Sequence, residues 1–171
     1  FLTTNGTKAS WASSAGVPYS GAHGAVNLGD YNLTVRGIKI GTSGTDNFAL
    51  QNNMVIGRDA LVNNTSGYNN IAMGNTALGL NVAGYNNVAI GNEAQYNNLW
   101  GWGNVSLGMA TLVLNITGNF NTAVGHGAGY FLTSSNNTAV GHNALNGQGN
   151  GGGNTGVGVN AGGVPWHQTT Y

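Results

Sequence analysis

The chain has 171 residues, of which 31 are glycine and only 5% are charged, and its formal net charge is zero. Asparagine is about as common as glycine, and the 40% of hydrophobic residues with so little charge excludes a typical disordered chain. There is no basic stripe for nucleic acid, no apolar stretch near the ~20 residues that cross a bilayer, and no cysteine for disulfides or thiolate chemistry.

The chain divides into three parts. Residues 1–40 are expected to form an N-terminal strand or connector segment of a trimer, 41–163 a repetitive body, and 164–171 a C-terminal cap or tip. The run from Ile38 to Gly41 ends 16 residues before Gly57 and is interpreted as a lead-in coil of the repeat.

A glycine that returns every 16 or 17 residues defines the repeat, and an asparagine stands four positions before each one. The glycines are Gly57, Gly74, Gly91, Gly108, Gly125, Gly141 and Gly158. The asparagines are Asn53, Asn70, Asn87, Asn104, Asn121, Asn137 and Asn154. Such a fixed period is the signature of a solenoid or array.

Between each asparagine and glycine lies a large-small-large triplet, such as Ile71-Ala72-Met73. This period of two predicts one strand of about five residues in each repeat, ended by a glycine that can adopt positive φ. Identical repeats stacked in register favour parallel pairing, with successive coils about 4.8 Å apart. The predicted fold is therefore all-β, a parallel β-roll or β-helix of about seven coils of 16–17 residues each.

The large residues of each triplet are expected to fill the coil, so that the small residue faces outward. A small outward residue predicts another backbone packed close to it, and a 17-residue coil encloses little core of its own. The sequence therefore predicts a homo-oligomer, for which threefold symmetry suits a rod. The asparagine column is expected to form a ladder of amide hydrogen bonds from coil to coil.

Several stretches resemble known groups of proteins: NNTAVGHNAL (136–145), FNTAVGHGAG (120–129) and NNVAIGNEA (86–94). Similar repeats occur in the heads of trimeric autotransporter adhesins and in bacteriophage tail fibres, where they precede a self-cleaving intramolecular chaperone. FLTTNGTKASW (1–11) and GAVNLGDYNLTV (24–35) resemble the flanking segments of phage fibres. The resemblance implies a homotrimer in the distal tail fibre of a virion, or alternatively on a bacterial surface. Its partner would be a bacterial receptor, either lipopolysaccharide or another glycan, or an outer-membrane protein.

Aromatic residues are the main candidates for receptor contact. Tyr68, Tyr85 and Trp102 each stand six positions before a repeat glycine and are expected to stack as a column on adjacent coils. Together with Trp100 they are candidate glycan-binding residues, because aromatic side chains often anchor binding surfaces. The alternative is a packed ladder that stabilises the roll or a subunit contact.

The C-terminal segment and two histidines are further candidates. A fibre tip would place Trp166, His167 and Tyr171 against a receptor, whereas the alternative is a cap over the last coil. His126 and His142 each follow a repeat glycine and are expected on neighbouring coils, where two imidazoles could share a metal ion. No carboxylate stands near them in sequence, so a surface ladder is favoured and no metal or cofactor is predicted.

An enzyme is not predicted. The acids Asp30, Asp46, Asp59 and Glu93 do not form the carboxylate pair that a glycan hydrolase needs. The glycine-rich run 149–153 lacks the Lys-Ser/Thr of a phosphate loop and is interpreted as a turn. The favoured function is adhesion by a receptor-binding module of a phage fibre. The alternatives are a structural shaft segment of a fibre, a bacterial adhesin head and an ice-binding solenoid.

Overall fold

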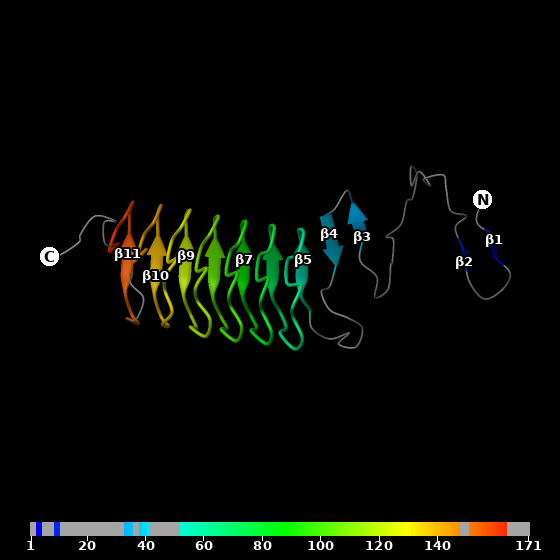
Figure 1. The fold of residues 1–171 in the computed structure, drawn as a ribbon, viewed down its shortest axis with the longest axis horizontal. Helices are drawn as coiled ribbons and strands as arrows, with labels where there is room; N and C mark the ends of the chain where they lie inside the picture. The colour runs from blue at the N-terminus through cyan, green and yellow to red at the C-terminus, as the bar shows by residue number, and fades with distance from the viewer. Residues whose placement is uncertain are drawn as a thin grey trace.

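The computed structural model describes residues 52–147 and 151–163, and before them the strand backbones of 3–4, 9–10, 33–35 and 38–41. All regular structure in these ranges is β, and none of it is a helix that could span a membrane. The short strands β1 (Thr3–Thr4) and β2 (Ala9–Ser10) pair antiparallel. The other nine strands form one sheet, in which neighbours follow the order of the sequence (Figure 1).

Seven strands of this sheet are parallel and stack in exact repeat register, one per coil. They are β5 (Met54–Ile56), β6 (Ile71–Met73), β7 (Val88–Ile90), β8 (Val105–Leu107), β9 (Thr122–Val124), β10 (Thr138–Val140) and β11 (Thr155–Val157). The predicted all-β parallel roll is thus confirmed. The strands have three residues instead of about five, because the asparagine and the glycine lie just outside them.

The prediction of a lead-in coil at 38–41 is wrong. β3 (Leu33–Val35) and β4 (Ile38–Gly41) form an antiparallel hairpin, and β4 pairs antiparallel with β5. Two residues separate β3 from β4, which is enough for a hairpin but far too short for the crossover that a parallel pair requires. The hairpin therefore continues the sheet beyond β5 without adding a coil to the roll.

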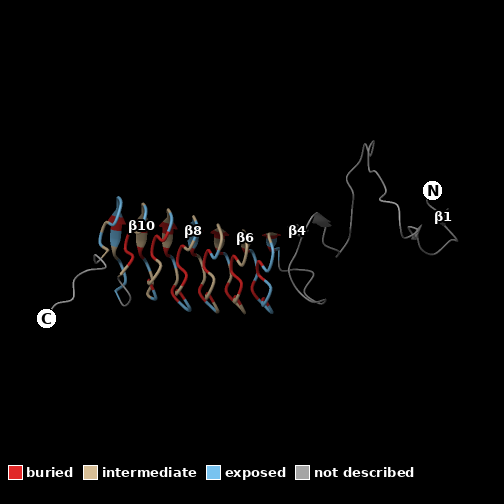
Figure 2. Ribbon diagram, turned by 45° about the horizontal axis from the view of Figure 1, so that its top comes forward, coloured by how far each residue is buried: buried red, intermediate tan, exposed pale blue. Residues whose placement is uncertain are grey.

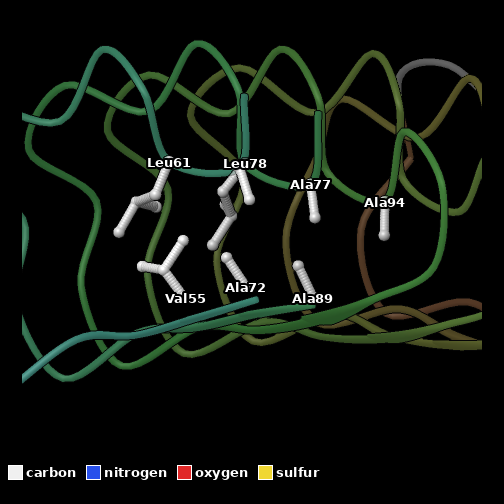
Figure 3. Close-up of a cluster of buried hydrophobic side chains, with 8 residues drawn as sticks. Val55, Leu61, Ala72, Ala77, Leu78, Ala89 and Ala94 are labelled. Carbon is white, nitrogen blue, oxygen red and sulfur yellow. The ribbon is translucent and has the colours of Figure 1, made fainter. Parts of the chain in front are cut away.

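The predicted orientation of the strand triplet is also wrong. In all seven parallel strands the small central residue is buried, and the two large residues beside it are half-buried or exposed. Figure 3 shows the reason: Ala72 and Ala89 of the strands point into the roll, toward the opposite wall that carries Ala77, Leu78 and Ala94. The two walls lie so close that alanine fills the gap, and leucines such as Leu78 fill the wider part.

The outer face of the sheet consequently carries the large residues of the repeat. Of the fourteen outward side chains, the three threonines of β9, β10 and β11 are polar and the other eleven are apolar. Figure 2 shows the buried positions inside the row of coils and the exposed ones on its outside. We call this surface the sheet face. The eleven apolar residues are Met54, Ile56, Ile71, Met73, Val88, Ile90, Val105, Leu107, Val124, Val140 and Val157.

The asparagine ladder is confirmed. From Asn70 onward, the backbone N–H of each ladder asparagine donates to the side-chain oxygen of its equivalent on the previous coil, as Asn104 does to Asn87 at 3.0 Å. The amide nitrogen of Asn87 donates in turn to the carbonyl of Gly101 within its own coil, at 2.8 Å. Because these groups are fully buried, the ladder supplies partners that water cannot.

A second asparagine ladder was not predicted. Asn64, Asn81 and Asn98 are buried at 17-residue intervals and join through side-chain amides, with 2.8 Å and 2.9 Å between donor and acceptor. Asn115 takes the next position, and each of the four donates to the carbonyl of the glycine three residues later. The two ladders fix the turn between them.

A polar layer interrupts the apolar interior between the third and fourth coils. Gln95 occupies a position that holds leucine in neighbouring coils, and its side-chain amide donates to Ser106 Oγ and to the Val88 carbonyl, both at 3.0 Å. Its own Oε1 has no hydrogen-bond partner among the described residues, although the side chain is fully buried. The layer lies between two separate apolar clusters, one ending at Ala94 and the other beginning at Leu112.

Replacing this layer by the residues of the neighbouring coils is expected to stabilise the protein. The double variant Gln95→Leu/Ser106→Ala removes both polar partners at once and should raise the free energy of unfolding by about 1 kcal/mol, since an unpaired buried oxygen is lost with them. Urea denaturation followed by circular dichroism measures the difference. A double variant less stable than the parent would contradict this account of the layer.

Candidate receptor-contact surface

The candidate surface is the turn that precedes each ladder asparagine, which we call the aromatic corner: residues 65–69, 82–86, 99–103 and 116–120. A buried glycine lies at the centre of each turn, between the two asparagine ladders. A Cβ at Gly101 would overlap Asn98 Oδ1 and approach the Gly118 carbonyl within 2.5 Å. The corner backbone is therefore held from both sides, so that it presents its side chains on a fixed scaffold.

The aromatic column predicted from the spacing is present. The rings of Tyr68 and Tyr85 stack with 4.8 Å between centroids and 6° between planes, and Tyr85 and Trp102 with 5.3 Å and 7°. Phe120 extends the column by an edge contact with Trp102, at 4.3 Å and 72°. Because Tyr85 is covered on both faces, a sugar cannot lie flat on its ring, whereas Tyr68 at the end of the described column is 42% exposed.

Trp100 is different, because its ring belongs to no such stack among the described residues. Hydrogen bonds from Ala83 N–H to the Leu99 carbonyl and from Trp100 N–H to the Ile116 carbonyl fix the register of the coils. In this register Ala83 and Thr117 flank Trp100 on the neighbouring coils, and neither can cover an indole. The side chain of Trp100 is accordingly 53% exposed.

Phe120 and Ile116 belong to the corner turn of the next coil, 116–120, and are 52% and 44% exposed. Phe120 adopts a φ of 56°, in a column whose other members include Asn69, Asn86 and Gly103. Asparagine and glycine are the residues that favour this left-handed region, so a bulky aromatic there is strained. The left-handed conformation is a regular feature of the repeat, because buried residues such as Leu78 and Leu112 adopt it as well.

The corner offers neutral polar groups around these rings. Asn119 Oδ1 accepts the backbone N–H of Trp102 at 2.9 Å, and the Asn119 amide nitrogen has no acceptor within the described ranges. The hydroxyl of Thr117 is exposed beside Ile116. Glu93, the one charged residue between 60 and 163, follows the far end of its strand and lies outside the corner. The surface is thus aromatic and hydrogen-bonding but carries no charge.

The two histidines lie as predicted on neighbouring coils. The rings of His126 and His142 are exposed and stack with 5.2 Å between centroids and 13° between planes. Within the part of the chain that the structure describes, no three His, Cys, Asp or Glu side chains are grouped for a metal ion. Asp59 and Glu93 occupy equivalent positions two coils apart, which is about 10 Å at the usual spacing.

The remaining predicted site residues lie outside the described residues. These are Trp166, His167 and Tyr171 of the C-terminal segment; the acids Asp30 and Asp46, which were not predicted to form a site, also lie outside the described residues. A contact of the C-terminal segment with a receptor stays a prediction, as does the alternative of a cap.

Phe120 and Ile116 are the corner residues that the sequence alone did not indicate. The sequence signal for Phe120 was available, because it replaces an asparagine or glycine in a regular column. Ile116 carried no such signal, since valine and leucine precede it in its column.

Comparison of this chain with protein-family models, with curated proteins and with solved structures returned no match.

Proposed function

We propose that this chain is a receptor-binding module from the distal part of a bacteriophage tail fibre and acts by adhesion to a bacterial surface receptor. The observation that carries the proposal is the open part of the aromatic corner, in which Trp100, Ile116 and Phe120 are exposed on a rigid backbone. Exposed apolar surface can mark a site of contact with a partner. The resemblance of the repeats and of segments 1–11 and 24–35 to phage fibres supports this class.

The working form is a homotrimer that joins through the sheet face. The apolar residues of seven strands face outward, and the interior of each coil is already filled by alanine and leucine. A parallel sheet normally has both faces covered, which a second and third copy of this chain would accomplish. Three copies of the corner on one rod would then raise avidity without a strong single site.

A structural shaft segment is the second candidate. The stack of Tyr68, Tyr85 and Trp102 favours it, since a stack of this kind can stabilise a rod without contacting a receptor. The exposed ring of Trp100 does not contribute to such a stack and is not explained by a shaft. The two candidate functions therefore differ in the role of Trp100: an adhesion module uses its exposed ring to contact a receptor, whereas a shaft segment has no use for it.

Cell binding by fluorescently labelled protein distinguishes the two candidates. The full chain is incubated with a panel of Gram-negative strains, beside the double variant Trp100→Ala/Phe120→Ala and the control Val62→Ala. Val62 is 59% exposed but lies outside the corner, so its loss should not matter. Adhesion predicts binding to a subset of strains that falls at least about tenfold in the double variant alone. Absence of binding to every strain would favour the shaft.

A further inference from the structure

The chemistry of the corner restricts what kind of receptor it can bind. We propose that the open part of the corner, formed by Trp100, Ile116 and Phe120, binds an uncharged polysaccharide chain of the bacterial surface. This inference rests on the proposed adhesion function and names the ligand class of that site.

The first step concerns the ring faces. A pyranose ring presents a patch of C–H groups that packs on an aromatic face, which requires a ring open on that face. Trp100 meets this requirement because Ala83 and Thr117 flank it, whereas Tyr85 does not because Tyr68 and Trp102 cover it. On the next coil Thr117 stands at the position equivalent to Trp100, and the exposed Ile116 precedes it.

The second step concerns the polar groups. Hydroxyl groups at the rim of a sugar need neutral donors and acceptors, which the amide nitrogen of Asn119 and the hydroxyl of Thr117 supply. Asn119 is held in place because its oxygen accepts from Trp102 N–H and its backbone N–H donates to Ser135 Oγ, both at 2.9 Å. The Asn119 side chain is therefore fixed in place before a ligand arrives.

The third step concerns charge. An anionic glycan would need a lysine or arginine to pair with its carboxylates or phosphates, because those groups are recognised by charge-assisted hydrogen bonds. Between residues 59 and 171 the sequence contains no lysine or arginine at all. The corner accordingly matches a neutral chain of hexoses and does not match the phosphorylated core of a lipopolysaccharide or an acidic capsule.

The test uses a bacterial strain that binds the full chain. Binding is measured after protease treatment of the cells, in the presence of competing polysaccharide, and at two salt concentrations. In one condition the cells are treated with proteinase K before the chain is added. In another, the strain's own polysaccharide is separated by anion exchange into a neutral and an acidic fraction, and each fraction is added as a competitor. We expect binding to survive the protease, to be inhibited by the neutral fraction alone, and to be the same in 0.1 M and 1 M NaCl, because no ion pairs are screened. Saturation-transfer NMR with the neutral fraction then reports contact directly.

Variants assign the contact to the corner. Trp100→Ala should weaken the affinity for the neutral fraction about tenfold or more, Trp100→Phe should retain most of it, and Tyr85→Phe should leave it unchanged, since only the Tyr85 hydroxyl is lost. Loss of binding after protease, competition by the acidic fraction alone, or a fall at high salt would overturn the proposed ligand while leaving adhesion intact. If no strain binds the wild-type chain, adhesion itself is refuted and the ligand with it.

Discussion

Replacing Gly91 with alanine is expected to lower the free energy of unfolding by about 4 kcal/mol or more, because two penalties act at this position. Its φ of 139° lies in a region that L side chains rarely adopt. In addition, a Cβ would overlap the carbonyl group of Gly108 on the next coil, which is backbone and cannot move aside cheaply. Thermal and urea denaturation followed by circular dichroism give the loss.

Gly153→Ala is the matched control for this prediction. Gly153 has a φ of 77°, and a Cβ there would meet nothing within 4 Å, so the substitution introduces strain without overlap. A cost of about 1 kcal/mol is expected from the backbone conformation alone. Equal costs for the two substitutions would show that the close approach of successive coils does not contribute.

Asn87→Ala is expected to cost about 3 kcal/mol, the second largest effect. The side-chain oxygen of Asn87 accepts the buried backbone N–H of Asn104 at 3.0 Å, and its amide nitrogen donates to the Gly101 carbonyl at 2.8 Å. The Gly101 carbonyl keeps a second donor in Asn98, but the Asn104 N–H would be left without a partner in a region that excludes water. An unsatisfied buried donor and the cavity of the missing side chain add up to this cost.

The control for the ladder is Asn92→Ala, in the same coil. Asn92 is half-buried on the outside of the roll, and its side chain makes no hydrogen bond within the described ranges. Its replacement should change the stability by less than about 0.5 kcal/mol. If Asn87→Ala were no more costly than Asn92→Ala in urea denaturation, the ladder would not stabilise the fold. The presence of asparagine at this position in every coil would then need another cause.

The sequence was sufficient for those features that depend on the period alone. A constant interval places equivalent residues on top of one another, so the parallel strands, the Asn87 ladder and the stack of Tyr68 on Tyr85 all followed from counting. The second ladder was equally readable, because Asn64, Asn81 and Asn98 recur at the same interval. It was missed because the surrounding turn residues vary.

The orientation of the strand triplet could not be obtained in the same way. Alternation with a period of two separates two faces of a strand but does not say which face is inside. That choice depends on the distance to the opposite wall, and here the walls approach until small residues such as Ala72 and Ala89 fill the space on the strand side. The usual expectation that large apolar residues are buried therefore fails for Ile71 and Met73, which are only half-buried.

The candidate site shows a similar division. The sequence indicated Trp100 and the column ending at Trp102, but it did not show that the column covers its own ring faces. That distinction depends on the size of the residues above and below each ring, which becomes visible once the register of the coils is known. Phe120 contacts Trp102 from a position whose backbone is left-handed in every coil. The conformational preference of an aromatic residue does not predict that conformation, so the contact was visible only in the structure.

The outward sheet face is the basis of the proposed trimer, and sedimentation equilibrium of the wild-type chain and of Met73→Glu/Ile90→Glu tests it most directly. Both residues lie on the sheet face, so two carboxylates there should prevent association while the interior of each coil stays intact. The predicted result is a wild-type species of three times the chain mass of 17.4 kDa and a monomeric variant with an unchanged circular dichroism spectrum. A wild-type chain that sediments as a stable monomer, or a variant that remains trimeric, would contradict the proposal.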